Sequence, residues 1–296
     1  MWFFVICPCT SYFWLPLGPD ADIVQLACVC GEESFNRYVL PQSPFDPKAS
    51  AVTGLHVVGG NLFYKQTKVN TVNTDICLKD FETWLQRFHK PLLVCHNGKV
   101  FDSIVFIRNV LKHPDSCLMT TVAGFVDTLH VFREILPNQP TYKLQNLVFN
   151  TMGISFEAHS ALEDAKVLER LVMHHKVAEG TLLNHSFGVD FVRSTILHKA
   201  KTVELLDTLK PLESCLSKYM LKKISSSGLS YDHLKLACER GGLEGIEKIL
   251  GEKTDGGSAR VTKNKKIIDQ IFSHFRWFYY ECFIFQNRDF CKYWYM

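Results

Sequence analysis

The sequence predicts a mixed α/β fold followed by a helical appendage, and three observations lead to this prediction. The segments Ile23–Val29 and Asn36–Leu40 flank a polar turn, which is the pattern of a β-hairpin. From there to His175, short apolar runs alternate with segments of helical periodicity. Beyond about Leu183 no strand pattern is convincing. Strands that alternate with helices indicate a sheet covered by helices, whereas the later region is typical of helices alone.

The elements after the hairpin follow from apolar spacing and from the residues that start and stop helices. Prolines at 41, 44 and 47 mark a loop, and Thr74-Asp75 is a plausible helix start. A run such as Pro91–His96 is short and apolar, as expected of a strand buried on both faces. The expected helices are Ala49–Leu55, Asp75–His89, Asp102–Leu111 and Lys143–Gly153, and the expected strands are Pro91–His96 and a strand within Thr121–Leu129 that ends at Asp127.

The helix expected over Ala161–His175 has the clearest start signal. Ser160 and Glu163 stand in S-x-x-E spacing, which predicts a capping box. This start places His159 just outside the helix and Asp164 one turn inside it. The two side chains can then face one cleft.

Two further helices are expected in the C-terminal region, over Phe191–Met220 and Tyr231–Leu250, separated by Ser225–Gly228. Residues 1–192 carry 15 Lys/Arg and 18 Asp/Glu, whereas residues 193–266 carry 15 and 9. A mildly acidic body is therefore followed by a basic segment. Such a segment is usually a solvated helical face, and attraction to phosphate is the alternative.

Composition limits the class of protein. A hydrophobic content of 47% and a charged content of 21% are typical of a globular chain, and a net charge of +3 does not by itself indicate a nucleic-acid binder. The 11 cysteines include no C-x-x-C pair, which argues against zinc ribbons and favours a reducing compartment, nucleus or cytoplasm. Neither apolar end has the pattern of a membrane span, so we expect no membrane partner.

Two motifs carry the candidate chemistry. The segment His96–Asp102 reads H-N-x-x-x-F-D, and the segment His159–Asp164 reads H-x-x-x-x-D. Together with Ala51–Leu55, Val126–Leu129 and Tyr142–Leu147, they resemble, in order, the motifs of the DEDDh 3′–5′ exonucleases. This family includes the proofreading subunit of bacterial replicase, RNase T and the three-prime repair exonucleases. The resemblance covers roughly residues 17 to 175.

The resemblance implies an RNase H-like mixed five-stranded sheet and hydrolysis from the 3′ end of single-stranded or frayed DNA or RNA. It implies that Asp102 and Asp164 hold two Mg²⁺ or Mn²⁺ ions and that His159 is the general base toward water. Asn97 and Phe101 would shape the cleft, and Thr53, Gly54 and Leu55 would lie near the terminal nucleotide. The family also suggests a homodimer. Taken singly, an aspartate at such a junction is often only a helix cap.

The first motif of the family, D-x-E on the first strand, is missing. Alignment places the two carboxylate positions on Ser11 and Phe13, and the first acidic residue of the chain is Asp20. Neither side chain can replace a carboxylate at a hard divalent ion. We therefore expect impaired or absent catalysis, as in an incomplete or alternatively started form. The alternatives are a pseudo-exonuclease that binds nucleic-acid ends or a protein partner, and a scaffold for the helical region. The apolar segment Trp2–Cys7 is the candidate for the place of the central first strand.

The basic helical region carries a second, shorter resemblance. Its segments Ser227–Leu234 and Gly241–Leu243 are similar to the region that follows the exonuclease-like part of one promyelocytic leukaemia protein isoform. The predicted domains are an atypical segment 1–16, an exonuclease-like domain 17–180, a basic helical region 190–268 with an unknown protein partner, and an aromatic tail 269–296.

Overall fold

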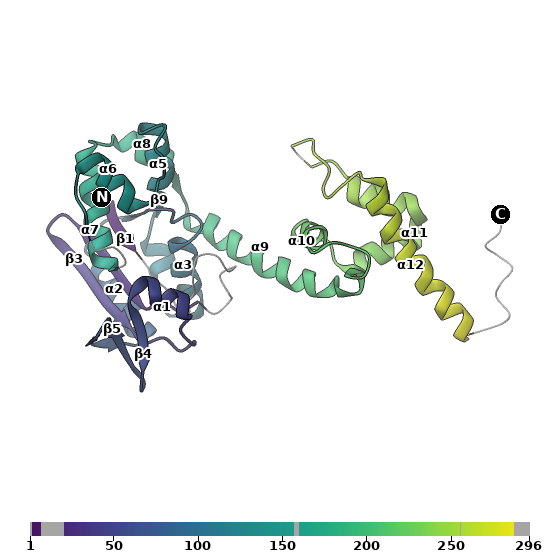
Figure 1. The fold of residues 1–296 in the computed structure, drawn as a ribbon, viewed down its shortest axis with the longest axis horizontal. Helices are drawn as coiled ribbons and strands as arrows, with labels where there is room; N and C mark the ends of the chain where they lie inside the picture. The colour runs from purple at the N-terminus through teal and green to yellow at the C-terminus, as the bar shows by residue number, and fades with distance from the viewer. Residues whose placement is uncertain (1, 7–20, 157–159, 255, 287–296) are drawn as a thin grey trace. The chain divides into compact units, whose positions relative to one another are not determined.

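The computed structural model describes residues 2–6, 21–156, 160–254 and 256–286 (Figure 1). The chain divides into two compact units, the sheet unit Met1–Ile196 and the helical unit Leu197–Met296. Each unit has its own apolar core and is described by itself.

The sheet unit is built on a 7-stranded mixed sheet with the order β10-β9-β8-β1-β2-β3-β7. The predicted α/β class is confirmed, and the hairpin pairs residues 25–30 with residues 33–38. The sheet has two strands more than expected, because two-residue strands extend each edge, and such short runs leave no periodicity in the sequence. The strands are β1 Trp2–Ile6, β2 Gln25–Cys30, β3 Glu33–Val39, β7 Thr71–Val72, β8 Leu92–Cys95, β9 Gly124–Asp127 and β10 Ser186–Phe187.

The apolar N-terminal segment forms the central strand of this sheet, the place for which the sequence made it a candidate. Strand β1 pairs antiparallel with β2, where Phe4 lies opposite Val29, and parallel with β8, where Phe4 lies opposite Val94. The folded sheet therefore includes residues that precede the expected domain start at 17.

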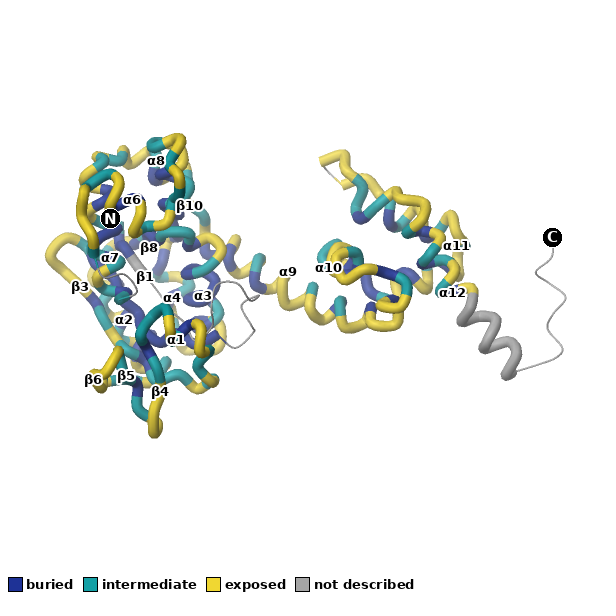
Figure 2. Tube along the Cα trace, in the orientation of Figure 1, coloured by how far each residue is buried: buried dark blue, intermediate teal, exposed yellow. Residues whose placement is uncertain are grey.

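Helices cover both faces of the sheet, and the alternation of strand side chains explains why. Phe3, Leu93 and Phe125 face a core shared with α2 Thr74–Leu85 and α3 Asp102–Lys112. Their neighbours in the chain face the opposite core, which is formed with α5 Thr128–Ile135, α6 Leu144–Met152 and α7 Ala161–His174. Figure 2 shows these strands buried between the helices. Short helices α4 Leu118–Thr121 and α8 Glu179–Asn184 complete this unit.

A small second sheet was not expected from the sequence. Helix α1 Pro47–Thr53 ends at Gly54, whose φ of 71° closes the helix two residues before the expected end. Three antiparallel strands follow in the order β4-β5-β6: β4 Leu55–Val58, β5 Asn61–Tyr64 and β6 Thr67–Lys68. Its inner face packs Leu55 and Leu62 against Val24.

The capping box expected at the start of α7 is absent, although the helix begins at Ala161 as predicted. The Ser160 side chain makes no cap hydrogen bond. Instead the Ala161 N–H donates to Oε1 of Gln25 at 3.1 Å, and Glu163 pairs with Lys166 at 2.8 Å. A buried amide from the sheet therefore replaces the local cap.

The helical unit differs from the sequence prediction at one point. The single helix expected over Phe191–Met220 is broken: α9 Val189–Thr208 ends before the 3-10 turn Lys210–Leu212, and α10 Lys218–Ser226 starts at the Ser217 cap. Pro211 lacks the N–H that a continuous helix needs there. The remaining helices are α11 Tyr231–Gly251 and α12 Lys265–Gln286.

Helix α11 contains a sharp kink at Gly242, whose φ of 57° and ψ of −136° are open to glycine alone. The unit's main core is formed by apolar side chains from the turn after α9 and from α10, α11 and α12, with Leu209, Leu212, Leu221, Ile224, Leu234, Ile246, Leu250, Ile268 and Ile271 among its members. Across the described part of the chain, no helix has the length and apolar character needed to cross a membrane.

Candidate functional site

The predicted site residues that the structure describes converge at the end of the central sheet where its parallel strands finish. We call this end the sheet edge. Strands β1 and β8 run parallel, so both end at this edge, and the next described element, α3, starts beyond β8 with Asp102. Strand β2 runs antiparallel to β1 and therefore begins here with Gln25. Because Gln25 caps α7 at Ala161, the first turn of α7 lies at the same edge. Ligands of α/β sheets commonly bind at the carboxyl ends of parallel strands.

The two aspartates approach this edge from opposite faces of the sheet. Asp102 is buried in the first turn of α3, and Asp164 is half-buried in the first turn of α7. Helix α3 belongs to one core and α7 to the other. The structure thus brings both predicted carboxylates to the same end of the sheet. His159, Ser11 and Phe13 lie outside the described residues.

Asp127 fixes the loop that leads to Asp102. Its Oδ1 accepts hydrogen bonds from the N–H groups of Asn97 at 2.8 Å and Leu129 at 3.0 Å, and its Oδ2 accepts one from Lys99 at 3.0 Å. The Asp127 side chain is buried at the end of β9, next to β8 in the sheet. Hydrogen bonds to a charged acceptor are stronger than neutral ones, so Asp127 holds this loop in place.

The loop itself requires glycine. A Cβ at Gly98 would lie 1.7 Å from Sγ of Cys95. Any residue other than glycine at this position would therefore clash with Cys95. The Gly98 carbonyl accepts the N–H of Ser103 at 3.0 Å and its hydroxyl at 2.7 Å. These contacts tie the loop to the first turn of α3, where Asp102 sits. Asn97 adopts a φ of 63°, a left-handed conformation that asparagine tolerates.

His96 links the same loop to the segment before α6. Its Nε2 lies 2.7 Å from the carbonyl oxygen of Tyr142, and its Nδ1 lies 2.9 Å from Oγ1 of Thr128. Burial lowers the pKa of the His96 imidazole, although the bond to Tyr142 opposes this effect. In the neutral ring, Nε2–H donates to the Tyr142 carbonyl, and Nδ1 lies beside the Thr128 hydroxyl, whose proton is within reach of the Cys95 carbonyl at 3.1 Å. His96 is therefore a positioning group.

The remaining predicted residues occupy two places. Thr53, Gly54 and Leu55 form the junction of α1 and β4, where the Thr53 hydroxyl donates to the Ala49 carbonyl at 2.8 Å. Leu55 is buried against Val24, the residue before β2, so this junction lies at the same sheet edge. Phe101 packs against the α3 core.

Asn97 lines a hollow of about 640 Å³ beside the loop. Two cationic side chains, Arg133 and Lys143, line it as well, and the Arg133 guanidinium stands 5.7 Å from the centre of the Tyr142 ring. The lining contains no carboxylate and is completed by His96, Leu129, Gln139, Pro140, Thr141 and Tyr142. The hollow therefore suits an anionic or polar ligand.

The described residues do not fit a two-metal site. Asp102 and Asp164 offer oxygen donors suited to a hard cation. However, no group of three or more His, Cys, Asp or Glu side chains is placed to hold a metal within residues 2–6, 21–156, 160–254 and 256–286. Strand β1, in the place of the first strand, contains no acidic residue. Two divalent ions close together need more anionic ligands than two aspartates supply.

Sequence reasoning missed the roles of three buried polar residues. Asp127 was expected to end a strand. Its position directly before a helix indicates a helix cap, but it does not indicate the hydrogen bonds to the loop after β8. Gln25 is an amide in an otherwise apolar strand, but no local pattern indicates that it caps a helix. Asp22 lies just before β2 and accepts the N–H groups of Gln42 and Ser43 at 2.9 and 2.8 Å.

The chain was compared with known families, curated proteins and solved structures. Residues 205–277 match the family model described as PML, C-terminal domain. This match confirms the shorter of the two resemblances drawn from the sequence. No curated protein matches the chain.

Two of the similar solved structures are of 3′ exonucleases. One is the nuclease domain of 3'hExo, a DEDDh family member, bound to rAMP, with 15% identity, a TM-score of 0.46, and coverage of 58% of this chain and 90% of that chain. Another comes from a structure of 3′-end specific recognition of histone mRNA stem-loop by 3′-exonuclease, with 13% identity, a TM-score of 0.45, and coverage of 58% and 80%. The fold assignment itself rests on the strand order and helix layers described above.

Proposed function

We propose that the sheet unit is a 3′–5′ exonuclease-type domain that binds the 3′ end of single-stranded or frayed DNA or RNA, and that hydrolysis is impaired in this chain. The observation that carries the proposal is the convergence of Asp102, Asp164 and the Thr53–Leu55 junction on one sheet edge. The cationic hollow beside Asn97 supports a phosphate-bearing ligand.

The expected impairment follows from the small number of carboxylates that could hold metal ions. Magnesium or manganese ions would supply the Lewis acid for phosphodiester hydrolysis, and hard cations of this kind are held by carboxylates. Asp102 and Asp164 remain, whereas β1 is apolar throughout. With the first-motif carboxylates replaced, we expect hydrolysis to be slower by several orders of magnitude.

The first experiment measures digestion by the purified chain. Single-stranded DNA and RNA labelled at the 5′ end are incubated with magnesium, with manganese or with EDTA. We expect little or no digestion under all conditions. Rapid metal-dependent digestion that Asp164→Asn abolishes would overturn the proposed impairment while supporting the exonuclease assignment.

The second experiment tests whether the two aspartates lie beside the bound 3′ end. Without metal, a carboxylate near a phosphate repels it, and two unit charges about 4 Å apart in water interact by about 1 kcal/mol. In EDTA, Asp164→Asn should therefore strengthen oligonucleotide binding by up to about fivefold.

The matched control is Glu163→Gln, which removes the same charge from the exposed neighbouring position paired with Lys166. We expect no change in affinity for this variant. An oligonucleotide with a blocked 3′ end should bind the wild-type chain more weakly than one with a free end. Equal responses of both variants, or indifference to the blocked end, would contradict 3′-end binding at this edge.

The alternative function is a protein-interaction module without catalysis. It is favoured by apolar side chains that the helical unit leaves exposed, with Val203 at 63% and Tyr219 at 73%. Light scattering of the full chain tests the simplest case, a homodimer. If Val203→Lys and Tyr219→Lys convert a dimer into a monomer, the helical unit is an assembly surface, whereas a wild-type monomer excludes this case.

A further inference from the structure

The small sheet has an inner face that packs Leu55 and Leu62 against Val24, and an opposite, outer face. In antiparallel strands, paired residues share a face. His56 pairs with Phe63, and Phe63 pairs with Lys68, so these three side chains form one row across β4, β5 and β6. The next pair on this face is Val58 with Asn61, and Val58 is 58% exposed. The inner face, with Leu55 and Leu62, is the one that contacts Val24 at the start of the large sheet's hairpin.

Two aromatic rings stack at the middle of this row. The ring centres of His56 and Phe63 are 5.7 Å apart, and their planes differ by 16°. Both residues are half-buried, and neither belongs to an apolar cluster of the described residues. Near-parallel rings on a sheet face are the kind of platform on which nucleic-acid bases stack, and every base offers a π face for such stacking.

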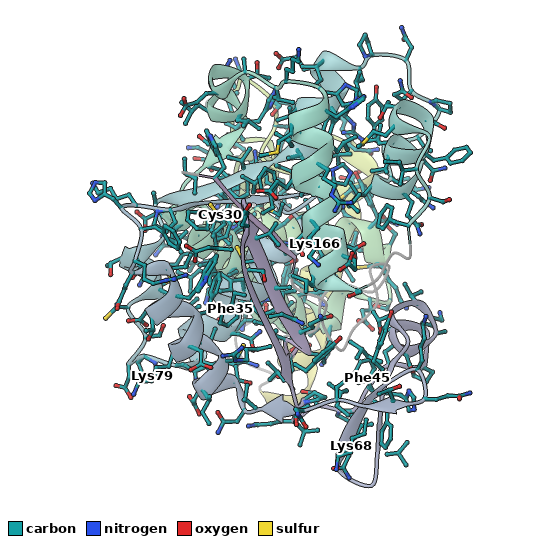
Figure 3. The ribbon with its side chains drawn as sticks, turned by 90° about the vertical axis from the view of Figure 1, so that its left-hand side faces the viewer. Cys30, Phe35, Phe45, Lys68, Lys79 and Lys166 are labelled. Carbon is teal, nitrogen blue, oxygen red and sulfur yellow. The ribbon has the colours of Figure 1, made fainter. Side chains whose placement is uncertain are left out.

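The charge of this region favours a polyanion. Residues 47–74 contain Lys48, Lys65 and Lys68 together with His56, and they contain no Asp or Glu. Lys65 and Lys68 are exposed, and Figure 3 labels Lys68 on the small sheet. A segment without Asp or Glu whose lysines lie beside aromatic rings attracts phosphates and offers stacking at the same place.

The platform continues the sheet edge described above. Strand β4 starts at Leu55, directly after Thr53 and Gly54, and the Lys65 N–H donates to the Gly54 carbonyl at 2.7 Å. The platform therefore lies directly beside the junction that is expected near the terminal nucleotide.

We propose that the outer face of β4–β6 binds single-stranded nucleic acid, with a base stacked on the His56–Phe63 pair and a phosphate beside Lys68. The location of the 3′ end relative to this face rests on the proposed function, whereas stacking and phosphate binding rest on the face itself.

The test is binding of fluorescent oligothymidylate and oligouridylate of about 15 nucleotides to the full chain in EDTA, followed by fluorescence anisotropy over a range of salt. Phe63→Ala should weaken binding of both oligonucleotides by about 5- to 100-fold, because one stacking contact is lost. Phe63→Trp keeps an aromatic ring and should bind both oligonucleotides about as tightly as the wild-type chain. Lys68→Ala should reduce the salt slope by about 0.7.

The matched controls lie elsewhere on the sheet unit. Phe149 on α6 is 61% exposed, so Phe149→Ala removes a comparable exposed ring, and Lys79→Ala removes an exposed lysine from α2. Neither should change the affinity. A duplex of the same sequence should bind more weakly, because its bases are already stacked. Circular dichroism and thermal unfolding check that each variant is folded.

The outcomes separate this proposal from the proposed function. Phe63-dependent binding that ignores a blocked 3′ end, without digestion, supports the platform and contradicts 3′-end recognition. Preference for one oligonucleotide identifies DNA or RNA as the ligand and supports the proposal in either case. Absence of binding by the wild-type chain, or equal affinity of wild type, Phe63→Ala and Lys68→Ala, overturns it.

Discussion

The two units bury polar side chains in very different ways. Among the described residues, the sheet unit buries Asp22, Gln25, Asp102, Ser103, Asn109, Asp127 and Thr128, whereas the helical unit buries only Ser225 and Ser230. Most of the first group stand where strands and helices meet at one end of the sheet. A buried polar group is costly unless it is hydrogen-bonded, so these residues are tied to fixed partners. The sheet unit is thus built to hold one edge in place, whereas the helical unit relies on apolar packing.

The largest expected effect is that of removing Asp127. Asp127→Ala should lower the free energy of unfolding of the sheet unit by about 3 kcal/mol or more, because hydrogen bonds to a charged acceptor contribute about 1.5–3 kcal/mol each. The control is Asp207→Ala in the helical unit, which breaks an exposed pair with Lys210 and should cost less than about 1 kcal/mol. Urea unfolding followed by hydrogen exchange and mass spectrometry resolves the two units. Equal costs would remove the contrast between them.

Glycine substitutions probe the same difference. Gly98→Ala should destabilise the sheet unit by about 1–3 kcal/mol through its clash with Cys95. A Cβ at Gly241 in α11 meets nothing within 4 Å. Gly241→Ala should therefore leave stability unchanged or raise it by up to about 1 kcal/mol, since alanine favours a helix. Thermal unfolding of both variants measures this, and a stable Gly98→Ala protein would contradict the described loop.

Two serines at helix starts sharpen the comparison further. Ser230 forms a full capping box with His233 at the start of α11, whereas Ser160 makes no cap bond at the start of α7. Ser230→Ala should cost about 1 kcal/mol of stability. Ser160→Ala should stay within about 0.5 kcal/mol of wild type. A larger loss at Ser160 than at Ser230 would show that the local capping box expected from the sequence does form.

The smallest expected effect concerns pH. Because burial lowers the pKa of His96 in the folded state, the unfolded chain binds a proton that the folded chain does not. Stability should therefore fall as the pH drops below about 6.5, the ordinary value for histidine. His96→Gln keeps a donor for Tyr142 but does not titrate, so its unfolding free energy should depend less on pH in this range. The same slope in both proteins would contradict a buried neutral His96.

Much of the fold could be predicted because its longer elements have a clear period. The β2–β3 hairpin, β8 and the helices α2, α3, α6 and α7 lie close to their expected places. The small sheet was missed, although Gly59-Gly60 between two apolar runs is a hairpin signal, and both glycines adopt positive φ.

The site could be predicted only in part. Motif spacing located Asp102 and Asp164 at helix starts, and the structure places both at one sheet edge. The bonds that hold this edge join residues distant in sequence. Gln25 caps a helix 136 residues later, and Asp127 anchors a loop about 30 residues earlier. A local sequence pattern cannot reveal these hydrogen-bond partners, because they come together only after strands β1, β8 and β9 have paired.

The central position of β1 has a consequence for synthesis. Residues 2–4 pair in parallel with residues 92–94, so one side of β1 has no partner until β8 has been made. At a translation rate of about 5–20 residues per second, this takes roughly 5 to 20 seconds. During that interval the central strand of the finished sheet is an apolar edge strand on a growing chain, open to pairing with a neighbouring nascent chain.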